Sequence, residues 1–460
     1  MQNSLIVVIF IFFQLHSLNG RDIAENMPSR EKPPHIIFII ADDLGWNDVG
    51  FHGSNQIPTP NIDALAYNGL ILNNYYVNPI CTPSRSALMT GKYPIHTGMQ
   101  HRVLYGAEPR GLPLNETLLP QHLQRLGYST HIVGKWHLGS YKLEYTPTFR
   151  GFESHIGYWT GHHDYFDHTA VENPYWGLDM RRGVDVAWDL HGQYSTKIFT
   201  EESEKLINNY NSSKPLFLYI AHAAVHSGNP YNPLPAPDNT VAKFSNIANY
   251  QRRKYAAMVS ELDDSVGRVV AALKNKKMLK NSIIIFTTDN GGPADGFNLN
   301  AASNWPLRGT KNTSVKGSTY NGDWDGWYGP SGHEGRQRYD IGQILGSKAN
   351  RAISSVMTTA TPESVRKTRH AAIIRCGEKL SSEARFSNCK PLKEPCLFNI
   401  VNDPCERENL ASSFPTVLKH LEELITVINK TVVPPSNLPW DEKGNPANWG
   451  NTWTNFGDSE

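Results

Sequence analysis

HIIFIIADD, residues 35–43, decides the fold, because seven mostly apolar residues are followed at once by Asp42 and Asp43. An apolar run without polar alternation predicts a strand that is buried on both faces, as in parallel sheets. Further runs of this kind are STHIVG (129–134), PLFLYIA (215–221) and SIIIFTT (282–288). Helical patterns lie between them, at 61–69, 119–127, 193–209 and 248–275. This alternation predicts an α/β fold with a large, mostly parallel mixed sheet sandwiched by helices.

The amino-acid composition of the sequence changes after about residue 313. Gly, Trp, Tyr and Asp dominate 318–335, after which HAAIIRC (370–376) and PCLFNIVNDPC (395–405) have the pattern of strands. An amphipathic helix is expected over 414–431. We therefore expect an α/β domain at 33–313 and a smaller C-terminal α+β domain at 314–460.

The N-terminal apolar run, residues 4–13, is about half as long as a membrane-spanning helix requires. It fits a signal peptide covering residues 1–20. Since no second long apolar run follows, we expect no transmembrane segment and entry into the secretory pathway, with the lysosome or the extracellular space as destination. The formal net charge of +1 gives no reason to expect a nucleic-acid partner.

Four of the five cysteines lie in the C-terminal third, and Cys81 stands alone upstream. In a secreted chain the four predict two disulfides, for which three connectivities exist. We favour Cys376–Cys389 and Cys396–Cys405, which close short loops. Sequons permit glycosylation at Asn115, Asn211, Asn312 and Asn429.

Polar residues follow four of the predicted strands directly or closely. They are Asp42 and Asp43, Lys135 and His137, His226, and Asp289 and Asn290. Ligands bind outside the carboxyl ends of the strands in open α/β sheets, so we expect these side chains to meet. The acids and the amide offer hard oxygen atoms, which favour Ca²⁺ or Mg²⁺. Asp48 and Asp63 are expected to serve only in turns or caps.

Basic groups and one thiol complete the predicted site. Lys135, His137, His226 and Arg85 would supply cations and proton donors for an anionic substrate. Cys81 opens a predicted helix, CTPSRSALMTG (81–91), whose N-terminus favours an anion or a thiolate. A soft thiolate beside a hard-oxygen metal site is a chemical mismatch.

With these motifs in place, the sequence resembles the sulfatase family. CTPSR (81–85) resembles the family signature Cys-x-Pro-Ser-Arg, in which the Cys is oxidised to formylglycine by a dedicated formylglycine-generating enzyme. The hydrated aldehyde is an oxygen nucleophile and a calcium ligand, and this removes the mismatch. The resemblance also implies the alkaline-phosphatase-like sulfatase fold.

The resemblance implies a role for each site residue. Calcium would be bound by Asp42, Asp43, Cys81 after modification, Asp289 and Asn290. Arg85 would hold the formylglycine diol, and His137 would assist its deprotonation. Lys135 and Lys311 would bind the sulfate oxygens, and His226 would protonate the leaving alcohol.

HTGMQH (96–101), GYWTGHHDYFDH (157–168) and PLRGTKNT (306–313) resemble the arylsulfatase B (N-acetylgalactosamine-4-sulfatase) branch. This implies a sulfated glycan such as N-acetylgalactosamine 4-sulfate, or an aryl sulfate, as substrate.

One departure from the family pattern stands out. In relatives the PLRG-x-K stretch continues into further elements of the large domain. Here Thr313 is followed by the Gly-, Trp-, Tyr- and Asp-rich stretch described above, which predicts an internal deletion.

Two alternatives follow. Related hydrolases with the same motif cleave phosphonates or phosphodiesters, although secretion, disulfides and the arylsulfatase-like segments argue against that reading. The deletion would instead favour a catalytically impaired isoform that only binds sulfated glycans.

Overall fold

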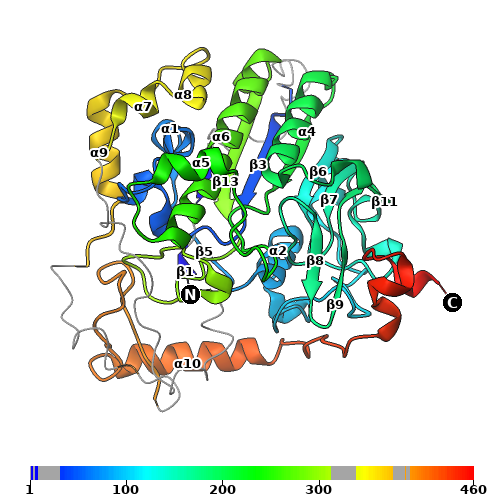
Figure 1. Ribbon diagram of the computed structural model, residues 1–460. Coiled ribbons are helices and arrows are strands. Elements are labelled where there is room, and N and C mark those ends of the chain that lie inside the picture. Colours follow the sequence, from blue (N-terminus) through cyan, green and yellow to red (C-terminus); the bar gives the residue numbers. More distant parts are fainter. Residues whose placement is uncertain are drawn as a thin grey trace, which may run out of the picture.

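In the computed structural model, which describes residues 2–3, 6–8, 32–311, 338–376, 389 and 394–459, a nine-stranded mixed sheet runs through the molecule (Figure 1). In spatial order its strands are β11 (Asp185–Val186), β10 (Arg181–Arg182), β7 (Ser154–Tyr158), β6 (Ser129–Lys135), β12 (Leu216–Ala221), β3 (His35–Ala41), β13 (Ser282–Thr288), β2 (Ile6–Val8) and β4 (Leu70–Ile71). From β7 to β13 the strands are parallel, and the outer pairs are antiparallel. Two small sheets pair β1 (Gln2–Asn3) with β5 (Tyr76–Val77), and β8 (Thr169–Glu172) with β9 (Tyr175–Leu178).

Helices cover both faces of the sheet, as the sequence predicts. The described helices are α1 (Pro60–Asn68), α2 (Cys81–Thr90), α3 (Leu119–Arg125), α4 (Ser195–Asn209), α5 (Asp238–Val241), α6 (Tyr250–Asn275), α7 (Ile341–Leu345), α8 (Lys348–Ile353), α9 (Pro362–Ala372) and α10 (Pro415–Asn429). Alternate residues of β3 point to opposite faces, so Ile37 and Ile39 join a core with α1, α4 and α6. Phe38 and Ile40 join a second core with α2 and α3.

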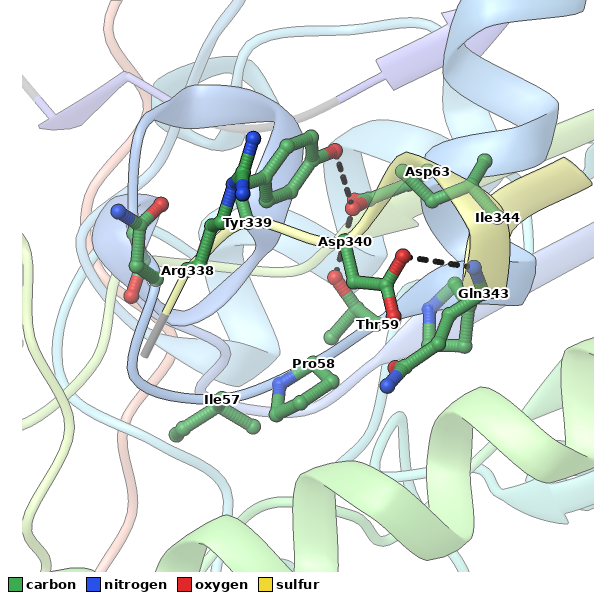
Figure 2. Close-up of a pocket in the computed structure, with 12 residues that line it drawn as sticks. Ile57, Pro58, Thr59, Asp63, Arg338, Tyr339, Asp340, Gln343 and Ile344 are labelled. Carbon is green, nitrogen blue, oxygen red and sulfur yellow. Dashed lines mark hydrogen bonds between the residues drawn. The ribbon is translucent and has the colours of Figure 1, made fainter. Parts of the chain in front are cut away.

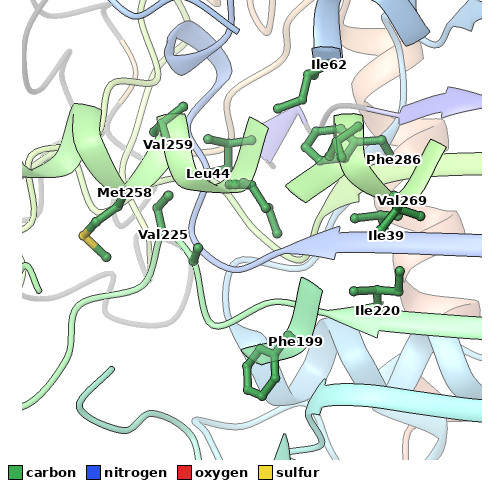
Figure 3. Packing of buried hydrophobic residues seen from close by; sticks show 14 of the residues in the cluster. Ile39, Leu44, Ile62, Phe199, Ile220, Val225, Met258, Val259, Val269 and Phe286 are labelled. Atoms are coloured by element: carbon green, nitrogen blue, oxygen red, sulfur yellow. The ribbon is translucent and has the colours of Figure 1, made fainter. Parts of the chain in front are cut away.

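The long helix α6 shows why this packing forms. Its buried apolar residues recur at helical spacing, with Met258, Val259, Leu262, Val266 and Val269 on one face. Figure 3 shows this face lying over β3 and β13, where Val269 approaches Ile39. Burying such a stripe removes each side chain from water, which stabilises the fold by about 1.5–3 kcal/mol per large aliphatic residue.

The segment that follows residue 337 packs against the same layer. Tyr339 donates a hydrogen bond to Asp63 Oδ2 (2.7 Å), and its hydroxyl lies 2.6 Å from that of Tyr67. Arg369 of α9 lies over the Tyr339 ring, 3.7 Å from its centroid. A small cavity of about 30 Å³ remains between this segment and the loop before α1 (Figure 2). These contacts fix α7 to α9 on the large sheet domain.

The C-terminal strands expected at HAAIIRC and PCLFNIVNDPC are not found. His370–Ala372 close α9, and residues 373–376 and 395–405 carry no strand. Propensity favoured a strand there, but the i+4 hydrogen bonds of α9 continue to Ile373, which donates to Arg369 O. The expected boundary at 313/314 falls at residues outside the described chain.

The disulfide pairing differs from the expected one. The structure joins Cys376 to Cys405 and Cys389 to Cys396, with Cα–Cα distances of 5.8 and 5.5 Å. The two bridges are nested, because Cys389 and Cys396 both lie between Cys376 and Cys405 in the sequence. Sequence spacing alone cannot distinguish this arrangement from two successive loops.

Helix α10 is confirmed where a helix was expected, but it has no buried residue. Val417, Leu421, Leu424 and Ile428 are all at least 40% exposed. In Figure 1 it lies along the lower border of the molecule, away from the sheet. A large apolar stripe in water is an uncommon feature of a monomeric protein.

At the N-terminus, β2 lies inside the expected signal peptide and pairs antiparallel with β13. Cleavage near Gly20, which remains a prediction, would take that neighbour away from β13. None of the described helices combines the length and the apolar character that crossing a bilayer demands. Asn115, Asn211 and Asn429 are exposed, while Asn312 lies outside the described residues.

Candidate active site

The carboxyl ends of β3, β6, β12 and β13 meet at one edge of the sheet, and the predicted site residues gather there. The structure brings together Asp42, Asp43, Cys81, Arg85, Lys135, His137, His226, Asp289, Asn290 and Lys311, each of which contacts at least one other member or an adjoining backbone group. Parallel register explains the convergence, since Thr288 lies beside Ala41 and Ala221 beside Ile40.

Each of the three carboxylates is paired with a cation from another part of the chain. Lys135 Nζ lies 2.6 Å from Asp42 Oδ2, and Lys311 Nζ lies 2.8 Å from Asp43 Oδ2. Arg85 binds Asp289 through two nitrogen atoms, at 3.0 and 2.9 Å.

These six charged side chains are all buried, and Asp42 and Lys135 are fully so. Removing a charge from water costs several kcal/mol per ion, and pairing recovers this only with good geometry. Apolar residues in these positions would serve stability at least as well. The arrangement therefore indicates a functional site.

The pKa values of the acids diverge. Burial works to raise the pKa of Asp42, but Lys135, His226 and Arg85 outweigh it and hold that pKa well below its usual range. Burial and the charge of Asp42 raise the pKa of Asp289 to about 7. Two neighbouring carboxyl groups with separated pKa values are typical of an active site.

Cys81 begins α2, and its Sγ lies 3.6 Å from Asp42 Oδ1. Burial raises the pKa of the Cys81 thiol to about 12, although Lys135 and Lys311 oppose the rise. The unmodified thiol is therefore not a thiolate at neutral pH. Arg85 lies one turn further along α2, on the same helix face, and also donates to Lys135 O (3.3 Å).

The two histidines are held by carbonyl groups that set their tautomers. His226 Nδ1 lies 2.6 Å from Ser227 O, so its Nε2 faces Asp43 Oδ2 at 3.6 Å. His137 Nε2 lies 2.9 Å from Leu104 O, and its Nδ1 is buried without a partner among the described residues. Burial and the charge of Lys311 lower the pKa of His226 to about 4.

Sequence reasoning missed the groups that support His137. Leu104 contributes a backbone carbonyl, which leaves no sequence signal. Its loop is held at Gly106, whose N–H donates to Glu172 Oε2 (2.6 Å). Trp453, near the C-terminus, packs on the same glycine, where an added Cβ would come within 2.6 Å of the indole. The C-terminal tail thus braces the active-site loop.

Several side chains of the site could hold a metal ion. Single ligand atoms of Asp42, Asp43, Cys81 and His226 lie within 4.8 Å of one another. Asn290 Oδ1 is buried without a hydrogen-bond partner among the described residues, while its Nδ2 donates to Asp43 Oδ1 (2.6 Å). An orphaned amide oxygen beside carboxylates suits Ca²⁺ or Mg²⁺ better than a softer metal. Asp289 is not a member of this group, and its carboxylate is bound by Arg85.

Asp48 and Asp63 accept hydrogen bonds from nearby backbone N–H groups, as expected for turns or caps, and each has a further partner. Asp48 Oδ2 accepts from Gly45 N (3.1 Å), and Asp63 Oδ1 accepts from Phe51 N (3.0 Å). Asp48 also forms a buried ion pair with Arg252.

Comparison with known proteins gives this geometry a family. The family model described as Sulfatase matches residues 34–328. The chain belongs to the sulfatase family. Mouse arylsulfatase J is 37% identical to this sulfatase over 91% of the chain and 80% of the relative. Human N-acetylgalactosamine-6-sulfatase is 31% identical, over 62% of the chain and 55% of the relative.

Solved structures agree with the fold. The crystal structure of Ps i-CgsB has a TM-score of 0.65 and 27% identity, covering 91% of this sulfatase and 97% of that protein. The predicted sulfatase fold and the arylsulfatase kinship are thereby confirmed.

The alignment with arylsulfatase J extends over 488 positions, although this sulfatase has 460 residues and 91% of them take part. The relative therefore has residues inside the aligned region that this chain lacks. The chain also spans only about half of N-acetylgalactosamine-6-sulfatase.

Glu172 accepts a hydrogen bond from Gly106, in the loop whose Leu104 carbonyl orients His137. This buried carboxyl group makes the free energy of unfolding depend on pH. Burial raises its pKa to about 8, with the charges of Asp179 and Glu108 adding to the rise and the Gly106 hydrogen bond opposing it. Because the folded pKa exceeds the unfolded one, the folded state binds the extra proton, and stability falls as pH rises from about 4.5 to about 8.

We expect Glu172→Gln to remove that loss, since Gln stays neutral and still accepts from Gly106. The free energy of unfolding at pH 8 should increase by about 1–4 kcal/mol relative to the parent, with little change at pH 5. Urea unfolding at both pH values measures this. Glu172→Ala, which loses the hydrogen bond, should be destabilised at pH 5. An identical pH slope in Glu172→Gln and the parent would contradict the assignment.

Proposed function

We propose that this sulfatase hydrolyses sulfate esters of glycans in the secretory pathway, with formylglycine formed from Cys81 and one bound Ca²⁺. The observation that carries the proposal is the buried cluster of three carboxylates, three cations and two histidines around Cys81. The three ion pairs cancel in charge, so a divalent cation held by the carboxylates would leave the site net positive and able to bind a compact anion away from most water. N-acetylgalactosamine 4-sulfate is the substrate we favour, from the sequence resemblance.

Asp42, Asp43, Asp289, Asn290 and modified residue 81 would hold the calcium. When bound, the ion neutralises sulfate charge and lowers the pKa of an oxygen nucleophile. The high pKa of the Cys81 thiol supports the modification, because an unmodified thiol would be inert here.

The remaining residues bind the ester and move protons. Lys135 and Lys311 bind the sulfate oxygens through their ammonium groups. His226 is neutral at pH 7, since burial lowers its pKa to about 4, so it must first gain a proton at Nε2 before it donates one to the leaving alcohol oxygen. His137 accepts the proton of the attacking hydroxyl at Nδ1. Water is consumed overall, and an alcohol and sulfate are released.

A glycan substrate has independent support from a related structure. Ps i-CgsB, 27% identical with a TM-score of 0.64, has a crystal structure in complex with k-i-k-neocarrahexaose. A phosphonate or phosphodiester substrate has no such support among the relatives described above.

Modification of Cys81 is the first test. We expect Cys81→Ala to abolish aryl sulfate turnover and leave the unfolding midpoint nearly unchanged, because one small side chain changes. Thr90→Ala, at the other end of α2, should retain activity. In a eukaryotic host with the formylglycine-generating enzyme, the peptide carrying residue 81 should react with aldehyde probes. An alkylatable thiol at residue 81 of active protein would refute the mechanism.

Calcium is the second test. We expect elemental analysis to find one Ca²⁺ per chain, and Asp43→Asn to weaken its binding and lower activity by orders of magnitude. Asp264→Asn, at a half-buried position that is paired with Lys348 outside the site, is the matched control and should behave as the parent does. Full activity after exhaustive chelation would count against a calcium enzyme.

The alternative of an impaired isoform is favoured by one observation, the residues that arylsulfatase J has and this chain lacks. We place the deletion after about Thr313, outside the described residues. Lys311 is the last site residue before it, and errors of about 1 Å in positioning can cost about a hundredfold in rate. A glycan on Asn312, next to Lys311, would obstruct the sulfate pocket. The exposed apolar stripe of α10 agrees with lost covering structure.

We therefore expect this 460-residue chain to be poorly secreted or to turn over aryl sulfate at least about a hundredfold more slowly than a version with the segment restored. Secreted yield and specific activity of the two, expressed side by side, measure this. Equal yield and equal activity would show that the shorter chain is a complete enzyme.

A further inference from the structure

The dipeptide Gly161–His162 lies between the two histidines of the active site. Gly161 packs on His137 so closely that an added Cβ would come within 2.8 Å of the imidazole. On the other side, the ring of His162 is stacked on His226, with centroids 6.0 Å apart and planes inclined by 19°. His162 thus lines the site without belonging to its charged cluster.

Hydrogen bonding fixes the orientation of this ring. His162 Nε2 lies 3.1 Å from Val171 O, and because a carbonyl only accepts, Nε2 carries the proton. Val171 is itself held, since its N–H donates to Asn229 Oδ1 (3.0 Å). The ring therefore cannot turn over without losing a bond, and Nδ1 is the atom left for another partner.

Nδ1 of His162 has no hydrogen-bond partner in the part of the chain that the structure describes, and the side chain is partly exposed. A neutral ring with a protonated Nε2 presents a lone pair at Nδ1. That atom accepts hydrogen bonds and repels the oxygen atoms of an anion.

We propose that His162 Nδ1 accepts a hydrogen bond from a hydroxyl group of the sugar that bears the sulfate ester. The inference rests on the proposed function and names a specificity-determining residue for it. Lys135 and Lys311 bind the sulfate group, and His226, once protonated, donates to the ester oxygen. A neutral acceptor on the ring that stacks on His226 matches a sugar hydroxyl, which simple aryl sulfates lack. A site built to bind a hydroxyl group discriminates against ligands without one.

Binding in the full-length Cys81→Ala background, with Ca²⁺ present, tests this without turnover. Calorimetry would measure the Kd of N-acetylgalactosamine 4-sulfate and of inorganic sulfate for the background protein and for added His162→Phe. Phe keeps the stacking on His226 and removes the acceptor. We expect His162→Phe to weaken sugar sulfate binding about tenfold, the effect of one lost hydrogen bond, and to leave sulfate binding within about twofold.

Two controls separate the outcomes. His162→Asn, which restores an acceptor, should recover part of the lost affinity, and the exposed His122→Phe should have no effect. Unchanged sugar sulfate binding in His162→Phe, or equal weakening for sugar sulfate and inorganic sulfate, would overturn the inference while leaving the proposed function intact. Failure of the background protein to bind either ligand would overturn the proposed function and this inference with it.

Discussion

Mutual neutralisation of buried charges at one sheet edge is the constraint on which the rest of the structure depends. Asp42 needs Lys135, Asp43 needs Lys311, and the partners come from positions far apart in the sequence. Any shift of one parallel strand against its neighbour would leave a charge unpaired in a dry interior, at a cost of several kcal/mol. The sheet register, the apolar cores on both faces and the helices that carry them hold these pairs together.

Much of this could be predicted because the signals are local. Buried parallel strands are continuous apolar runs, so HIIFIIA became β3 over the same seven residues. The rule that ligands meet the carboxyl ends of strands then located Asp42 and Asp289 without any contact information. The cysteine and arginine of α2 needed only the helical repeat to place them on one face. The sequence did not predict which cation pairs with which carboxylate. Lys311, the partner of Asp43, lies in a loop, where no periodic pattern places it.

The parts that escaped prediction depend on contacts between backbone and distant side chains. The orientation of His137 rests on the carbonyl of Leu104, and a carbonyl is present at every residue. Trp453 braces that loop from the far end of the chain, and composition gives no hint of the contact. Near Ile373 a helix prevailed over strand propensity because neighbouring turns were already helical. The predicted disulfide pairing was wrong, because the spacing of cysteines along the sequence does not show which of them meet in the fold.

The nested bridges have a consequence for a nicked chain. The outer bond between Cys376 and Cys405 encloses every peptide bond from 376 to 405, including those around the inner bond. A protease that cuts once anywhere in this interval would therefore leave both fragments covalently joined until a reductant is added. Two successive loops would have released the C-terminal fragment after a cut between 389 and 396. Through this topology Trp453 stays tethered to the loop it braces, even in a clipped molecule.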